Sequence, residues 1–195
     1  MTLPKWQPGT SHDTSPFPPI RDHLAHKRYD NLLGAEVGVF RGETARKLLI
    51  HFPRLILLCV DNWAVNSLTE EPIEDIQAEA RASLYKFSNH DSRATLLELD
   101  SLEAARRQTD STFDFVHIDA DHTKPAALAD MLAWWPKLKL DGVLFAHDYN
   151  HPNPMQGWDV AGAVAEFVTE CGSRLQPLRH AVDGLTWKCW RHLDG

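Results

Sequence analysis

The segment Phe113–His122, with the sequence FDFVHIDADH, begins as an apolar run and ends in ionisable side chains. Its polar end contains the carboxylates Asp119 and Asp121 and the imidazoles His117 and His122. Ionised groups at the end of a buried strand cost free energy unless a ligand, an ion or a neighbouring charge compensates them. Carboxylates next to imidazoles can hold a metal ion or move a proton. The segment therefore predicts a site of binding or catalysis.

Other apolar runs in the chain also end in polar residues. Strands are expected at residues 34–40, 55–60, 94–99, 113–118 and 142–146, and the acids behind the last four are Asp61, Asp100, Asp119 and, after His147, Asp148. Helices are expected at residues 21–29, 43–50, 70–87, 101–108, 125–135 and 158–171, with Ser101 and Thr123 as N-caps. This alternation predicts an α/β fold, a Rossmann-like doubly wound sheet whose ligands bind at the carboxyl ends of its strands.

The two ends of the chain differ from the alternating middle. Residues 1–20 are rich in Pro, Ser and Thr and are expected to form a flexible N-terminal arm, which leaves residues 21–195 as a single domain. Runs at residues 174–178 and 185–190 follow each other without a helix. One of these two strands is therefore expected to run antiparallel in a mostly parallel sheet.

Composition excludes several classes of protein. The 195 residues carry a formal charge of -7 and no basic tract, which argues against nucleic acid as a partner. The three cysteines form no CxxC pair, so a zinc knuckle or a redox motif is not expected. No apolar run is long enough for a membrane helix, and no signal peptide is recognisable. We expect a cytoplasmic protein without a membrane partner.

The turn after the first expected strand reads EVGVFRGETA and contains Gly38 and Gly42. Glycines allow a ligand to approach the backbone, and the following helix offers free N–H groups. The spacing does not meet the G-x-G-x-x-G fingerprint, which disfavours a nicotinamide oxidoreductase. Asp61 follows about twenty residues later, where a carboxylate can bind ribose hydroxyls in nucleotide-binding folds.

Five blocks in this order resemble the class I S-adenosylmethionine-dependent methyltransferases. The blocks are AEVGVFRGETARKLL, LLCVDNW, LLELDS, FDFVHIDADH and DGVLFAHDY, and the resemblance runs from about Gly34 to Asn150. The chain is most similar to the small O-methyltransferases of the macrocin type and, more distantly, of the catechol type. The resemblance implies methyl transfer from S-adenosylmethionine to a hydroxyl of a small molecule. Apart from the resemblance, we expect residues 21–195 to be the methyltransferase domain, and a homodimer is one expected form of it.

The resemblance also implies a role for each matching residue. The residues implied to surround the methionine part of the cofactor are Glu36, Gly38 and Gly42, and Asp119 would face the reactive methyl group. Asp61 would hold the ribose, with Asn62 and Trp63 near the adenosine. Asp100 and Ser101 would flank the adenine.

Metal-dependent relatives hold a divalent ion with the acid after the fourth strand and two adjacent residues after the fifth. The corresponding residues here are Asp119, His147 and Asp148. Related enzymes usually carry an acid at the position of His147. Because Mg²⁺ prefers oxygen ligands, either the ion is softer than Mg²⁺ or His147 is not a ligand and serves as a base or a cap.

The general base implied by the resemblance is His122. Catechol-type relatives carry a basic catalytic side chain three residues after the acid that corresponds to Asp119, and a histidine at the start of a helix is the ordinary alternative. His117 shares a strand face with Asp119 and is expected to be a hydrogen-bonded core histidine. Asp121 is expected to cap or brace the turn.

Two other functions fit parts of the sequence. HIDADH resembles the H-x-H-x-D-H signature of binuclear zinc hydrolases, but Asp119 stands where the second histidine should be. The second alternative is a domain that binds S-adenosylmethionine without catalysis, because a fold does not fix a function.

Overall fold

The computed structural model describes residues 17–64, 71–149, 153, 155–171, 175–177 and 187–191. Its strands form one sheet in the order β3-β2-β1-β4-β5-β7-β6. The strands are β1 (Leu33–Val37), β2 (Ile56–Val60), β3 (Ala94–Leu97), β4 (Phe113–Ile118), β5 (Leu138–Ala146), β6 (Leu175–Pro177) and β7 (Trp187–Arg191). The helices are α1 (Phe17–Leu24), α2 (Glu43–His51), α3 (Ile73–Tyr85), α4 (Ser101–Arg106), α5 (Lys124–Trp134) and α6 (Val160–Cys171).

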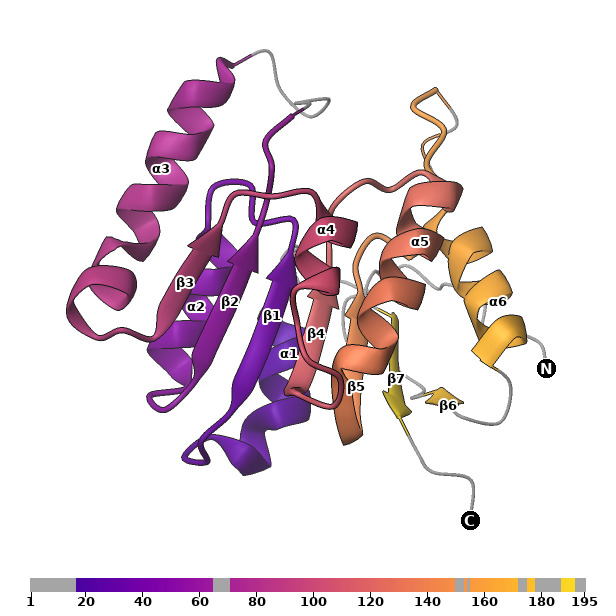
Figure 1. Cartoon of the computed structure of the whole chain (residues 1–195), viewed down its shortest axis with the longest axis horizontal. Coiled ribbons are helices and arrows are strands. Elements are labelled where there is room, and N and C mark those ends of the chain that lie inside the picture. Colours follow the sequence, from indigo (N-terminus) through magenta and orange to yellow (C-terminus); the bar gives the residue numbers. More distant parts are fainter. Residues whose placement is uncertain are drawn as a thin grey trace.

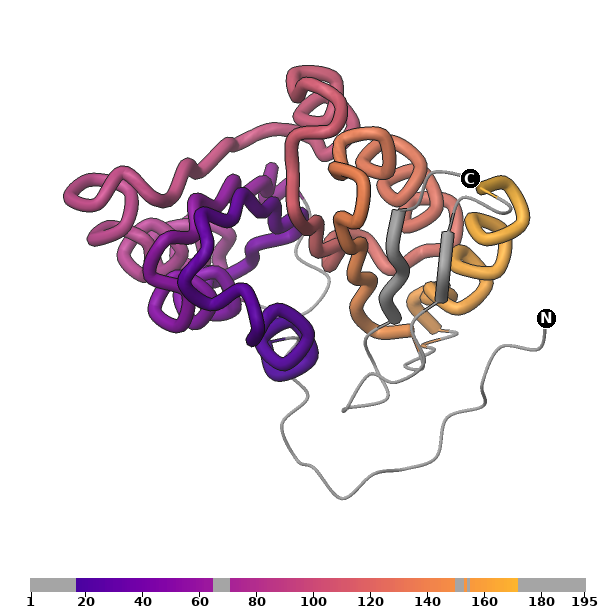
Figure 2. The backbone as a smooth tube through the Cα atoms, turned by 90° about the horizontal axis from the view of Figure 1, so that it is seen from below, coloured from indigo at the N-terminus to yellow at the C-terminus, as the bar shows by residue number. Residues whose placement is uncertain are grey.

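Strands β3, β2, β1, β4 and β5 are parallel, as the sequence predicted for a Rossmann-like α/β fold. Strand β7 pairs antiparallel with β5, and β6 pairs antiparallel with β7. Helices α1 and α2 lie on one face of the parallel strands and α4 and α5 on the other (Figure 1). Figure 2 shows α1 and the α4–α5 pair on opposite sides of the strands. The fold therefore has three layers.

Two apolar cores fill the spaces between these layers. Alternate residues of β4 and β5 point to opposite faces, so Phe115 and Phe145 pack with the α1–α2 layer and Val116 and Leu144 with the α4–α6 layer. All four side chains are fully buried. Burying such a side chain contributes roughly 1.5–3 kcal/mol, and these two cores hold the strands in the register that positions the site.

Several element bounds differ from the prediction for local reasons. Helix α1 begins at Phe17 and buries Ile20, so residues 17–20 are not part of a loose arm, and residues 1–16 lie outside the described residues. Proline is tolerated in the first turn of a helix, which lets the helix begin there. The N-cap of α4 is Asp100 rather than Ser101, because its carboxylate accepts the backbone N–H groups of Leu102 and Glu103. The side chain of Thr123 precedes α5 without making a capping hydrogen bond.

The sheet continues its hydrogen bonding one residue beyond the named strands. The four backbone N–H groups that extend it belong to Gly38, Asp61, Asp119 and His147. Their distances to the acceptor carbonyls of Val60, Leu97, Val37 and Ile118 are 2.9, 3.2, 2.7 and 3.0 Å, respectively. The predicted site residues at the strand ends therefore share one edge of the sheet.

Gly38 is required by the close approach of β1 to β4. Its φ is +89°, and a Cβ atom there would overlap the carbonyl oxygen of Asp119. The glycine therefore serves contact within the protein before any contact with a ligand. None of the helices in the described part of the chain has the length and apolarity to cross a membrane.

We expect Gly38→Ala to lower the free energy of unfolding by about 2–4 kcal/mol, because a left-handed backbone strains an L-residue and the new methyl group meets a packed carbonyl. Gly157 is a matched control, since its φ is +72° and nothing lies within 4 Å of an added Cβ atom. Gly157→Ala should cost only about 1 kcal/mol. Urea denaturation of both variants gives the comparison, and equal losses would contradict the close-approach argument.

Candidate active site

A cavity of about 510 Å³ opens at the carboxyl ends of the parallel strands. Its volume lies in the range of small-molecule sites. The predicted site residues that line it are Gly38, Asp61, Asn62, Trp63, Asp100, Ser101, Asp119 and His122. The turns after β1, β2, β3 and β4 therefore meet around one space, as the positions of these residues in the sequence predicted.

Asp61 connects the turns after β1 and β2 through hydrogen bonds of its carboxylate. Its Oδ2 accepts the backbone N–H groups of Val39 and Phe40 at 2.9 Å each, and its Oδ1 accepts the N–H of Trp63 at 2.8 Å. The indole N–H of Trp63 donates to the carbonyl of Phe40 at 3.0 Å. Trp63 is therefore a loop anchor that also forms part of the cavity wall, and Asp61 shapes the wall as well as facing it.

Three polar residues near the end of β3 and on α5 line the cavity, and they differ in their hydrogen-bond partners. Oδ1 of Asp100 accepts the N–H groups of Leu102 and Glu103 at 3.0 and 3.2 Å. The hydroxyl oxygen of Ser101 accepts the indole N–H of Trp134 at 3.0 Å. Asp130, a cavity-lining acid on α5, has an exposed fraction of only 5%. Burial raises the pKa of Asp130 to about 6, and the nearby Ser101 hydroxyl offsets only part of this rise.

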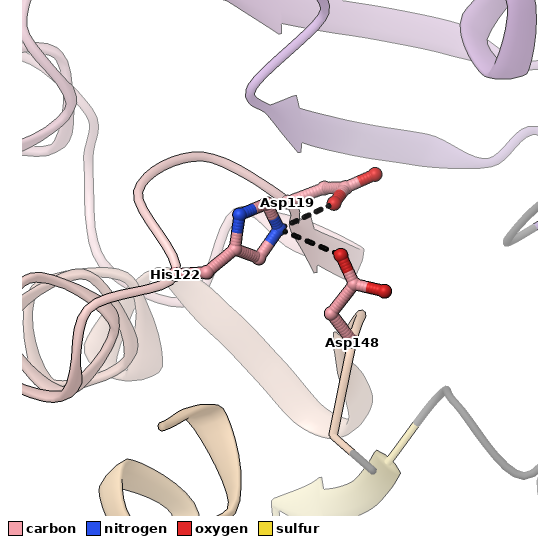
Figure 3. A group of neighbouring side chains, drawn as sticks. All are labelled: Asp119, His122 and Asp148. Atoms are coloured by element: carbon pink, nitrogen blue, oxygen red, sulfur yellow. Dashed lines mark hydrogen bonds and ion pairs between the residues drawn. The ribbon is translucent and has the colours of Figure 1, made fainter. Parts of the chain in front are cut away.

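Two carboxylates and an imidazole meet where β4 and β5 end (Figure 3). Nε2 of His122 lies 3.2 Å from Oδ1 of Asp119 and 3.1 Å from Oδ2 of Asp148. Ligand atoms of these three residues all lie within 4.8 Å of one another, which is close enough to share one metal ion. His147 lies beside them, with Nδ1 at 3.3 Å from Asp119 and 3.4 Å from Asp148.

The charges of this cluster stabilise one another. Burial alone would raise the pKa of Asp119, but the neighbouring His147 and His122 outweigh burial and hold that pKa below its usual range. Burial acts to lower the pKa of both histidines, and the carboxylates overcome it and raise both values. The cluster therefore favours an ionised Asp119 beside imidazoles that hold a proton.

Trp158 and Asp159, just before α6, contact His122. The ring of Trp158 lies 4.5 Å from that of His122, measured between centroids, and both side chains line the cavity. The backbone N–H of Asp159 donates to the carbonyl of His122 at 3.0 Å. Residues 150–152 and 154 of the loop before α6 lie outside the described residues. The Trp158 contact fixes the His122 ring and shields one side of it.

Residues 35–149 match the methyltransferase domain family, which is more than half of the chain. The chain belongs to this family. It is a class I, S-adenosylmethionine-dependent methyltransferase, as the ordered blocks of sequence predicted. Methyltransferase membership disfavours the zinc hydrolase reading of the HIDADH segment. No curated protein matches the chain.

Solved structures share the fold of this methyltransferase at low sequence identity. A predicted caffeoyl-CoA O-methyltransferase from Staphylococcus aureus is 11% identical with a TM-score of 0.65, and the match covers 88% of this chain and 80% of that one. A predicted O-methyltransferase from Klebsiella pneumoniae is 17% identical with a TM-score of 0.64 and coverage of 94% and 83%. The O-methyltransferase NovP is 14% identical with a TM-score of 0.63 and coverage of 89% and 76%.

Two predicted cofactor residues of the methyltransferase do not line the cavity. Glu36 is 2% exposed, and its Oε1 lies 3.5 Å from Nδ1 of His117, in the layer beneath the cluster. Gly42 has a φ of +74° at the N-terminus of α2, and a Cβ atom there would contact Ala80 and Ser83 of α3. Their contact with the methionine part of the cofactor stays a prediction.

Among the cavity residues that the sequence analysis missed, two have side chains that bear on the chemistry of the site. Asp130 lies on the face of α5 that also buries Ala127, Met131 and Trp134. A carboxylate on an otherwise apolar helix face was the signal that could have identified it. The second is Trp158, and no local pattern indicated that its ring would pack on His122.

The raised pKa of Asp130 predicts a pH-dependent effect on stability. An aspartate titrates near 3.9 in an unfolded chain and at about 6 here, so its ionisation opposes folding as the pH rises through this interval. Asp130→Asn should therefore raise the free energy of unfolding by about 2 kcal/mol at pH 8 and by nearly nothing at pH 4. Urea denaturation at pH 4, 6 and 8 measures the difference. A difference that stays constant with pH would contradict the raised pKa.

Proposed function

We propose that this methyltransferase transfers a methyl group from S-adenosylmethionine to a hydroxyl oxygen of a small molecule, with help from a divalent metal ion. The observation that carries the proposal is the convergence of Asp119, His122 and Asp148 beside a cavity of small-molecule size, which Asp119 and His122 line. The O-methyltransferases among the solved structures of similar fold support the choice of oxygen as acceptor.

The cavity residues fit the cofactor by their chemistry. Asp61 and Asn62 offer carbonyl-type oxygens to ribose hydroxyls, and Gly38 leaves the backbone open at the turn after β1. Asp119 stands at the other end of this row, beside the imidazoles, where we place the reactive end of the cofactor. When bound, S-adenosylmethionine supplies a methyl group on a positively charged sulfur, which acidic walls favour.

The donor set also fits a divalent ion. Two carboxylates and an imidazole suit Mn²⁺, Fe²⁺, Ni²⁺ or Zn²⁺ better than Mg²⁺, because imidazole is a softer ligand than oxygen. Asp119 and Asp148 would hold the ion together with either His122, which lies nearest to both carboxylates, or His147, which the resemblance implies. When bound, such an ion lowers the pKa of a substrate hydroxyl.

The remaining chemistry belongs to the side chains themselves. In its neutral form, which requires loss of the proton that the carboxylates favour, His122 can accept the hydroxyl proton at Nε2, and Asp119 and Asp148 stabilise the imidazolium that results. The same nitrogen cannot hold a proton and bind an ion at once, so His122 serves in one role or the other. Trp158 keeps water from one side of the ring. Alignment of donor and acceptor provides the rest of the rate enhancement.

Metal binding by variants of the protein distinguishes the ligand set that contains His122 from the set that contains His147. Calorimetric titration with Mn²⁺ should show binding that Asp119→Asn and Asp148→Asn reduce at least 10-fold. A loss in His122→Gln but not in His147→Gln would identify His122 as the third ligand, and the reverse would identify His147. Asp121→Asn is the matched control, because that side chain caps the backbone N–H of Thr123. Undiminished Mn²⁺ affinity in the Asp119 and Asp148 variants would rule out this metal site.

Methyl transfer itself is tested with labelled S-adenosylmethionine and a panel of phenol, catechol and sugar acceptors. We expect label on oxygen, and we expect His122→Gln to lower kcat at least 100-fold with the affinity for S-adenosylhomocysteine unchanged. Binding of S-adenosylhomocysteine without transfer to any acceptor would favour the non-catalytic alternative. Full activity of His122→Gln would remove both roles assigned to this histidine.

A further inference from the structure

Helix α3 forms one wall of the cavity through the side chains of Ile73 and Ile76. These residues belong to a small apolar cluster with Trp63 and Ala80, distinct from the two main cores. Helix α5, which also lines the cavity, packs instead on one of the main cores. A segment that rests on a small satellite cluster opens more readily than one that is packed on a main core. Helix α3 is therefore the cavity wall that other contacts must hold in place.

Arg41 connects this wall to the turn after β1. Its Nη2 lies 2.7 Å from Oε2 of Glu71, just before α3, and its Nη1 lies 2.5 Å from Oε2 of Glu79, within α3. The guanidinium also lies over the ring of Phe40, 5.0 Å from its centroid. The planar fork of an arginine can bind two acceptors at once, which a lysine cannot do with the same geometry. One side chain thus joins the turn to two carboxylates of the α3 wall.

The turn that carries Arg41 is itself held firmly. Phe40 lines the cavity, its backbone N–H donates to Oδ2 of Asp61, and its carbonyl accepts the indole N–H of Trp63. The φ of Phe40 is +50°, a conformation that persists only where surrounding contacts fix it. The ion pairs of Arg41 therefore attach α3 to a fixed point beside the cavity.

We infer that Arg41 is a positioning residue that clamps α3 over bound S-adenosylmethionine, an inference that rests on the proposed function. With both ion pairs formed, Ile73 and Ile76 are held against the apolar side of the cofactor. When the pairs break, α3 can move away from the Phe40 turn and the cofactor can leave. Arg41 contacts no reacting group, so it acts on the retention of the cofactor and not on methyl transfer.

The test measures S-adenosylhomocysteine on the full-length protein, its affinity by calorimetry and its dissociation rate by stopped-flow tryptophan fluorescence. Arg41→Met should raise the dissociation rate and the dissociation constant about 10-fold, the scale expected for two partly exposed ion pairs. Arg81→Met is the matched control on the same helix. Arg81 pairs with Glu98 at 2.7 Å, and Glu98 keeps its hydrogen bond from Gln77 in that variant, so both quantities should stay at the wild-type values.

Salt dependence distinguishes a clamp made of ion pairs from a general effect on packing. Raising NaCl from about 50 to about 500 mM should speed dissociation from the wild-type protein several-fold, because salt screens exposed charges. Dissociation from Arg41→Met should hardly respond. The double variant Glu71→Gln with Glu79→Gln removes the clamp from the α3 side and should match Arg41→Met, so it also serves if Arg41→Met does not fold. Adding Arg41→Met to the double variant should cause no further loss.

The outcomes separate this inference from the proposed function on which it rests. A wild-type dissociation rate in Arg41→Met, or a wild-type response to salt in that variant, would overturn the clamp. An equal change in Arg81→Met would overturn the assignment to Arg41, since any ion pair of α3 would then have the same effect. Absence of S-adenosylhomocysteine binding by the wild-type protein would instead overturn the proposed function, and this inference with it.

Discussion

The parallel hydrogen bonding of β1, β2, β4 and β5 is the constraint on which the site depends. The pairing continues one residue past the strands, through the backbone N–H groups of Gly38, Asp61, Asp119 and His147. Neighbouring strands stand about 4.8 Å apart, so side chains at this edge reach one another without any long excursion of the chain. A slip of one residue in β4 would turn Asp119 to the opposite face and disperse the cluster.

Much of the fold could be predicted because these strands are buried on both faces. The apolar run of β4 matches the expected strand at both ends, since Asp119 interrupts it sharply. Strand β5 begins at Leu138, before the expected residue 142, and its pairing with β4 is irregular between Phe113 and Phe115. Asp141 has a φ of +60° there. A local pattern of apolar residues does not reveal such an irregularity, because it depends on the partner strand.

The sequence predicted which residue types form the candidate site, but it did not predict which hydrogen bonds their carboxylate oxygens accept. Asp61 was expected to serve a ribose, yet its oxygens accept the backbone N–H groups of Val39, Phe40 and Trp63. Two of these donors lie more than twenty positions away in the sequence, so nothing local to Asp61 indicated them. The shape of the wall thus depends on the same carboxylate that we propose to bind the ribose. This double use explains how a short chain forms a defined cavity with few residues.

The buried residues His117 and Glu36 lie beneath the cluster, and they are polar although they are in the core. Nδ1 of His117 lies 3.5 Å from Glu36, and its Nε2 lies 4.0 Å from Oδ2 of Asp119. Burial raises the pKa of Glu36, since His117 only partly offsets the cost of removing its charge from water. Apolar residues at these two positions would pack at lower cost. Neither ring nitrogen of His117 has a hydrogen-bond partner among the described residues, so the hydrogen-bonded core histidine that the sequence predicted is not found. The pair instead gives Asp119 a polar neighbour on its buried side.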